Sequence, residues 1–257
     1  MNTLTLAMRD SSTMVRRQLK RLLRYPSMTV QLVATPAILL VLFVYVFGGT
    51  LGAGIGGGRD AYVDYVVPGI LLMAAATAAT GTAVMVATDM TEGIIARFRS
   101  MRISRASVLT GHVIGSLVQQ LLSMAVLIGI ALAIGFRPNA SAVEWLAAAG
   151  VLTLLVLAVT WLAVALGLKS STPEAASNAP MPLILLPFLG SGFVPTDSMP
   201  TALRWFAEYQ PFTPIMETVR GLLLGTPIGN SAVIAAAWCT GIALVSYLWA
   251  KNTFNKA

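Results

Sequence analysis

The chain has 257 residues, of which 56% are hydrophobic and 11% are charged, with a net charge of +7 and a mean hydropathy of +0.78. A soluble chain carries about 25% charged residues, and a disordered one has low hydrophobicity, so both classes are excluded. The composition indicates an all-α integral membrane protein. The single cysteine, Cys239, and the single histidine, His112, exclude a disulfide framework, cysteine-based metal sites and most Ser-His-Asp schemes.

The N-terminal segment, residues 1–27, is basic and amphipathic. Between Ser11 and Tyr25, apolar residues recur at helical spacing and basic residues fill the other positions. This pattern predicts an interfacial helix on the cytoplasmic membrane surface, which either only anchors the chain to anionic lipid or also touches a cytoplasmic partner. The apolar run that follows is too long for the core of a signal peptide, so we expect it to be retained as a helix. The basic residues of this predicted helix are Arg16, Arg17, Lys20, Arg21 and Arg24.

Six apolar stretches then approach the roughly 20 residues that a helix needs to cross a membrane. The fifth is short and contains three prolines, which predicts a kinked or broken helix. We therefore expect one transmembrane domain, 1–257, with a six-span bundle over 28–249 and a cytoplasmic tail over 250–257. The six stretches are Met28–Gly48, Val66–Thr88, Leu109–Gly135, Trp145–Leu168, Ala179–Val194 and Ser231–Trp249.

The segment between the first two spans, Gly48–Gly58, contains glycines at G-x-G-x-x-G spacing. It follows no predicted strand and opens no βαβ unit, so it lacks the context of a nucleotide-binding loop. We expect a flexible external loop instead. No G-x-x-x-x-G-K-[ST] sequence occurs anywhere in the chain, which therefore has no phosphate-binding loop of its own.

Within the second span, the run Ala74–Gly81 is rich in alanine, threonine and glycine. Small residues let helices approach each other closely. The run is therefore interpreted either as packing within one subunit or as part of a subunit interface.

The segment after the second span contains a short apolar stripe formed by Ile94, Ile95, Phe98 and Met101, surrounded by arginines. This pattern predicts a short amphipathic helix with an aromatic residue at its centre. Such a helix either inserts into a groove of another protein or anchors the loop to the membrane.

The segment between the last two spans, 195–230, is too apolar for a free loop. We expect it to dip into the outer leaflet or to lie along it. Just before it, Gly190-Ser191-Gly192 resembles the surroundings of an intramembrane serine nucleophile, but no general base is expected near it.

The distribution of basic residues predicts the orientation. Thirteen of the 17 Lys and Arg residues lie in the N-terminal segment, the second and fourth connections and the C-terminal tail, and four lie on the other side. Because basic loops stay cytoplasmic, both termini are expected inside. None of the predicted spans contains a charged residue in its middle, which gives little support to a proton- or ion-coupled carrier.

Several motifs resemble one family. Tyr65-Val-Val-Pro68-Gly69-Ile-Leu, Glu92-Gly93-Ile94-Ile95-x-Arg97-Phe98-Arg99-Ser, Phe193-Val-Pro195, Gln210-Pro211-x-Thr-Pro214 and Arg220-Gly-Leu-Leu-x-Gly are similar to segments of type-2 ABC exporter permeases, close to the daunorubicin/doxorubicin-resistance group. One departure is Met101-Arg102, where that group often has Leu-Pro. These matches extend from about residue 60 to 225, and the span count fits the whole chain.

The resemblance implies a half-transporter: two permease copies, identical or paralogous, form the pathway, and two separate ATPase subunits bind beneath them. The chain itself would be no enzyme and bind no cofactor or metal, since ATP and Mg²⁺ belong to the ATPase partner. The segment after the second span would be a cytoplasmic coupling helix docked into the ATPase, and the segment after residue 192 would form an outer gate region. The implied coupling residues are Glu92, Gly93, Ile94, Ile95, Arg97, Phe98, Arg99, Met101 and Arg102, and the implied outer gate residues are Phe193, Pro195, Pro211, Pro214, Glu217 and Arg220.

The function expected from these observations is ATP-driven export of an amphipathic molecule, either drug-like or lipid, out of the cytoplasm or the inner leaflet of a bacterial plasma membrane. Alternatives are a secondary transporter or channel independent of ATP, and an intramembrane enzyme. The sequence predicts no nucleic-acid partner, because the loop bias of a membrane protein accounts for the positive charge.

Overall fold

Long helices form where the sequence stays apolar, because a backbone in hydrocarbon must pair its N–H and C=O groups within its own segment. The computed structural model describes residues 26–92 and 105–256, which form helices and turns with no strand among them. Five helices in these ranges are long and apolar enough to cross a membrane. One is composite and runs from Val30 to Gly54; the others lie within α4 (Gly58–Thr91), α6 (Arg105–Ile134), α7 (Ala142–Lys169) and α12 (Ser231–Lys256).

The composite helix consists of three consecutive pieces. α2 (Pro26–Leu42) continues through a π-helical turn, η1 (Phe43–Phe47), into α3 (Gly48–Gly54). The expectation of a flexible loop over 48–58 is therefore wrong for its first part. A glycine costs about 1 kcal/mol in a helix, which is less than an unpaired backbone group costs in an apolar medium. The turn itself comes at Gly56 and Gly58, both of which have positive φ.

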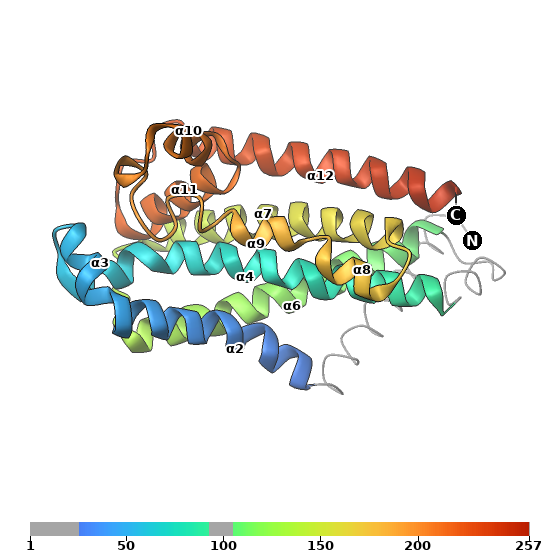
Figure 1. Cartoon of the computed structure of the whole chain (residues 1–257), viewed down its shortest axis with the longest axis horizontal. Coiled ribbons are helices and arrows are strands. Elements are labelled where there is room, and N and C mark those ends of the chain that lie inside the picture. Colours follow the sequence, from blue (N-terminus) through green and yellow to red (C-terminus); the bar gives the residue numbers. More distant parts are fainter. Residues whose placement is uncertain (1–25, 93–104, 257) are drawn as a thin grey trace.

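The predicted fifth span, Ala179–Val194, is broken, and the prolines explain why. α8 (Pro173–Asn178) begins at Thr172, whose hydroxyl accepts a hydrogen bond from the N–H of Ala175. α9 (Met181–Leu185) has only five residues and gives way to turns. This segment packs against α4 and runs from the end of the bundle where α7 finishes to the end where α10 (Thr201–Tyr209) lies (Figure 1).

The segment 195–230 contains the short 3₁₀ turn η2 (Thr196–Ser198), α10 and α11 (Phe212–Leu224). α11 packs against α4, α7 and α12, and most of its side chains are buried. It ends at Gly225, which adopts the left-handed conformation with φ of 75°. α10 differs, because most of its side chains are exposed. The segment 195–230 is therefore largely helical, with one buried helix and one surface helix.

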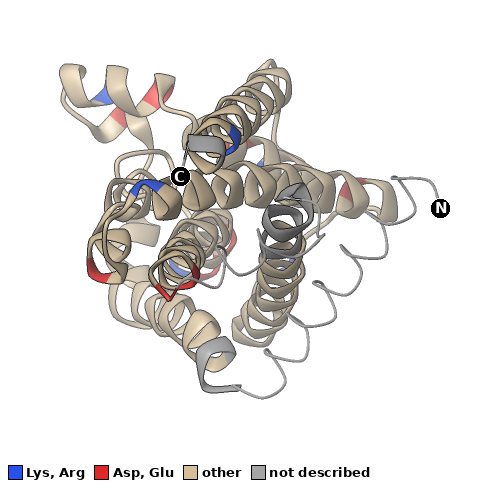
Figure 2. Ribbon diagram, turned by 90° about the vertical axis from the view of Figure 1, so that its right-hand side faces the viewer, with Lys and Arg blue, Asp and Glu red and all other residues tan. Residues whose placement is uncertain are grey.

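α4 is the central helix of the bundle: it contacts α2, α3, α6, α7, α8, α9 and α11. α12 packs along α7 and continues to Lys256, so residues 250–256, expected as a tail, extend the last helix. Charged residues are sparse along the ribbons when the bundle is viewed from one end (Figure 2). This arrangement places the ends of α4, α7 and α12 at one side of the apolar layer and α3, α10 and α11 at the other (Figure 1).

Candidate functional site

The outer motifs of the sequence meet around Arg220 of α11. Its guanidinium Nη2 donates hydrogen bonds to the carbonyl oxygens of Ser191, at 2.7 Å, and Tyr65, at 3.1 Å. The guanidinium carbon also lies 3.9 Å from the centre of the Tyr65 ring, a cation–π contact. Pro68 leaves a gap in the hydrogen-bond ladder of α4 next to this point. Arg220 thus fastens α11 to α4 and to the turns after α9.

Gln210 makes the second connection in this region. Its side-chain nitrogen donates to the carbonyl of Leu186, at 3.1 Å, and to the hydroxyl of Thr213, at 3.0 Å, and its side-chain oxygen accepts from the N–H of Phe212, at 3.2 Å. Pro211 is the N-cap of α11, and Pro214 lies buried in its first turn. The Gln210–Pro214 motif therefore sets the corner between α10 and α11.

Phe193 lies in an aromatic cluster beneath this corner. Its ring stacks on Phe188 with centroids 4.4 Å apart, and it contacts Phe43 of η1 at 4.5 Å. Its carbonyl accepts a hydrogen bond of 3.2 Å from the hydroxyl of Tyr62. The cluster joins the π-helical turn of the first helix to the broken fifth segment.

The other outer residues lie at the edges of this region. Pro195 is the N-cap of η2, and Glu217 accepts a hydrogen bond of 3.0 Å from the hydroxyl of Ser231 at the start of α12. On exposed α10, the hydrogen bond that Arg204 donates to Glu208 and the negative charge of Asp197 raise the pKa of Arg204.

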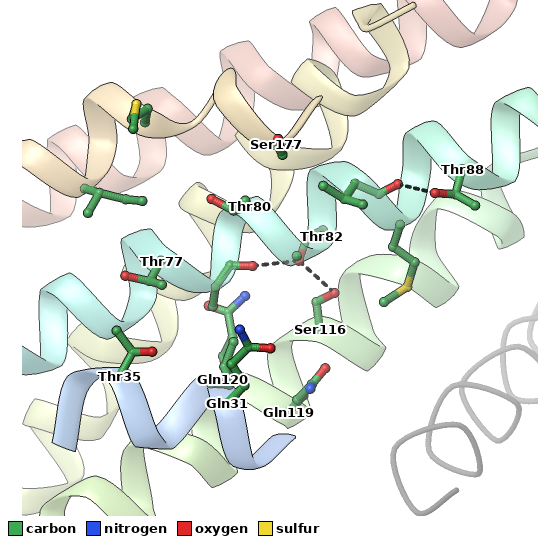
Figure 3. A pocket seen from close by; sticks show the side chains of 17 residues that line it. Gln31, Thr35, Thr77, Thr80, Thr82, Thr88, Ser116, Gln119, Gln120 and Ser177 are labelled. Carbon is green, nitrogen blue, oxygen red and sulfur yellow. Dashed lines mark hydrogen bonds between the residues drawn. The ribbon is translucent and has the colours of Figure 1, made fainter. Parts of the chain in front are cut away.

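A cavity of about 580 Å³ lies within the bundle between α2, α4, α6 and the α8–α9 segment. Figure 3 shows polar side chains from each of these parts around it. None of the lining residues is ionisable. They are Gln31, Leu32, Thr35, Thr77, Ala78, Thr80, Gly81, Thr82, Val84, Met85, Thr88, Ser116, Gln119, Gln120, Ser177, Met181 and Ile184.

Hydrogen bonds between helices fix the inner wall of the cavity. The hydroxyl of Thr82 on α4 lies 3.1 Å from that of Ser116 on α6, and the amide nitrogen of Gln120 donates to the hydroxyl of Thr160 on α7, at 3.3 Å (Figure 3 shows the first pair). A cavity with an apolar body and a few fixed polar groups is the usual form of a small-molecule site. This cavity has that form, and none of its lining residues is charged.

Sequence reasoning did not single out the cavity residues. It identified Ala74–Gly81 as a run of small residues and expected close packing or a subunit interface. The alanines of this run are buried, but Thr77, Thr80 and Gly81 face the cavity. The available signal was their spacing: with Thr88, they recur on one face of a helix.

Two of the predicted functional groups lie outside the described residues, except for one residue. Within the predicted coupling segment, only Glu92 is described: it caps α4, its N–H donates to the carbonyl of Thr88 at 2.9 Å, and it is exposed. The rest of that segment, and all five basic residues of the predicted membrane-surface helix, are not described. Among the described residues, no cluster of His, Cys, Asp or Glu is suited to a metal ion.

Comparison with known proteins identifies the family of this chain. A sequence profile described as "ABC-2 type transporter" matches residues 10–224. The chain is 26% identical to the daunorubicin resistance ABC transporter permease protein DrrB1 of Streptomyces coeruleorubidus, over 86% of this chain and 74% of that protein. It is 24% identical to the probable doxorubicin resistance ABC transporter permease protein DrrC of Mycobacterium tuberculosis, over 73% of this chain and 68% of that protein. The chain belongs to the ABC-2 type transporter family and is a membrane permease subunit of an ABC exporter.

Proposed function

We propose that this permease pairs with a second permease copy and with two ATPase subunits to move an amphipathic, drug-like or lipid molecule out of the cytoplasm or the inner leaflet. The observation that carries this proposal is the cavity of about 580 Å³, whose wall combines hydroxyl and amide groups with leucine, isoleucine, valine and methionine. A lining without charge suits a molecule taken from within the bilayer. ATP and Mg²⁺ belong to the ATPase partner in this scheme.

In the proposed topology the chain crosses the membrane six times, with both termini in the cytoplasm. The broken α8–α9 segment supplies the fifth crossing, and its course along α4 supports this (Figure 1). α10 rests at the outer interface, because Trp205 and Tyr209 are each 65% exposed, and such aromatics favour the headgroup region. The outer gate region then consists of the Arg220 and Phe193 contacts, which lie beyond the cavity.

We propose that α4 transmits the movement caused by the ATPase to the cavity. This helix has 34 residues, carries the cavity threonines and ends at Glu92, where the predicted coupling segment begins. A displacement of that segment by the ATPase would be transmitted along one continuous helix. The N-terminal basic segment is proposed to lie on the membrane surface beside the ATPase, held by anionic lipid.

Filling the cavity tests the proposed substrate site. Gly81 lines the cavity, and a Cβ there has nothing within 4 Å, so Gly81→Trp places a large ring in the space without a backbone clash. We expect this variant to assemble with the ATPase but to lose substrate-stimulated ATP hydrolysis and export. The matched control is Gly241→Trp on α12, at a glycine that is equally open and outside the cavity. Export by Gly81→Trp at the control's rate would refute the proposal.

Phe98→Ala tests the coupling segment. An aromatic anchor at the centre of an interface is worth about 2 kcal/mol, which weakens a complex roughly 30-fold. We expect the variant to insert normally while it releases the ATPase or uncouples hydrolysis from transport. Co-purification and export assays measure the two effects. Normal export with the ATPase still bound would show that this segment is a membrane anchor and not a coupling helix.

A further inference from the structure

The cavity wall presents more hydrogen-bond acceptors than donors. The hydroxyl protons of Thr77 and Thr88 are directed to the helix carbonyls of Met73 and Val84, each at 2.9 Å. Ser177 likewise donates to the carbonyl of Glu174, at 2.7 Å. A hydroxyl whose proton is committed in this way offers only its oxygen lone pairs to a ligand.

Two further groups in the wall have no partner among the described residues. Gln120 is 3% exposed, and its amide nitrogen donates a hydrogen bond to the hydroxyl of Thr160. Its side-chain oxygen is buried, and no described residue donates a hydrogen bond to it. The hydroxyl of Thr80 is also buried without a partner, but it can donate as well as accept, so it favours neither kind of ligand. Both residues line the cavity (Figure 3). A buried polar atom without a partner is costly, so a ligand that supplies a donor gains more here than in water.

The remaining amides do not reverse this bias. Gln31 and Gln119 each have two N–H donors and an oxygen with two lone pairs, so they add as many hydrogen-bond donors as acceptors to the wall. No lining residue is an acid, so the attraction is to donor groups and does not require a positive charge on the ligand.

We propose that this cavity selects, among amphipathic molecules, those that carry N–H or O–H donors on an apolar body, with the side-chain oxygen of Gln120 as the selecting group. This inference rests on the proposed function, since it names the substrate class of the same cavity. It separates donor-bearing amphiphiles from equally apolar molecules that lack donors.

A pair of dyes tests the preference. Rhodamine 123 and tetramethylrhodamine methyl ester share one scaffold and one positive charge, but N-methylation removes every N–H donor from the second. The full-length permease is placed in lipid nanodiscs, and equilibrium binding is followed by fluorescence anisotropy against empty discs. Gly81→Trp, in which the cavity is filled, defines the part of the signal that comes from this site.

We expect rhodamine 123 to bind about fivefold more tightly, although its partner dye is the more apolar. Gln120→Met should weaken rhodamine 123 binding severalfold and leave the methylated dye unchanged. Thr160→Val removes the same hydrogen bond between α6 and α7 but keeps the oxygen of Gln120, so rhodamine 123 should still bind more tightly than the methylated dye to this variant. Thr153→Val on α7, outside the cavity, is the control and should change neither dye.

The other outcomes overturn the inference in distinguishable ways. Equal binding of both dyes, lost in Gly81→Trp, would refute donor selection and leave the proposed function standing. Binding that is unaffected by Gly81→Trp, or absent for both dyes, would refute donor selection together with the proposed substrate site.

Discussion

Two faces of α4, about a third of a turn apart, use small residues for opposite purposes. Ala76, Ala79, Ala83 and Ala87 are fully buried, and α7 comes so close to this face that a Cβ on Gly167 would lie 2.5 Å from the carbonyl oxygen of Ala83. The neighbouring face carries Thr77, Thr80, Gly81 and Thr88 and borders the cavity. Small side chains thus permit close packing where a helix lies opposite, and leave space where none does.

The largest loss of thermal stability is expected from a substitution on the packed face. Gly167→Leu forces side-chain atoms into the backbone of α4, and overpacking costs about 3 kcal/mol when the neighbour cannot move. We expect little monodisperse protein and a much lower melting temperature in detergent. Gly150→Leu on the same helix has nothing within 4 Å of its Cβ and serves as the control. Equal melting of the two variants would show that α4 and α7 are not closely packed.

An intermediate loss of thermal stability is expected where Arg220 of α11 contacts Tyr65 of α4. Arg220→Met keeps the length of the side chain but removes the donors to Ser191 and Tyr65. A hydrogen bond to a charged group contributes about 2 kcal/mol, so thermal stability should fall measurably. Arg204→Met on exposed α10 removes an arginine that is also ion-paired, and it should leave stability unchanged. If both variants behave alike, Arg220 does not fasten α11 to α4.

The smallest free-energy difference is expected for a hydrogen bond in the cavity wall. A double-mutant cycle with Thr82→Val and Ser116→Ala should give a coupling of about 0.6 kcal/mol, the usual size for a hydrogen bond between membrane helices. Equilibrium unfolding in mixed micelles measures it. A coupling as large as the loss in Arg220→Met would mean that the cavity wall is as firmly held as the packed face, and the contrast between the two faces would disappear.

The course of the chain could be read largely from local sequence. Three of the predicted spans lie within single long helices, and a fourth, Leu109–Gly135, ends one residue beyond α6. The first extends further than expected, to Gly54. The break in Ala179–Val194 follows from its prolines. The first part of the predicted loop over 48–58 is helical instead, because glycine signals a turn in water, whereas an apolar setting favours the paired helical backbone.

The candidate site was predictable only in part. The outer motifs pointed to Phe193, Gln210 and Arg220, and the structure brings their segments together. The cavity was missed, because threonine in an apolar helix bonds to its own backbone and gives little sign in sequence of what lies opposite.

Hydropathy, prolines and basic loops act over a few residues, so the sequence by itself determined that this chain lies in a membrane as helices and which stretches of the chain form them. The tertiary structure decided which face of α4 is packed and which borders a cavity. It also decided that Arg220 bonds to a carbonyl 155 residues away and that the oxygen of Gln120 has no partner among the described residues. These features depend on which helix lies opposite, and small residues are compatible with either outcome until the bundle assembles.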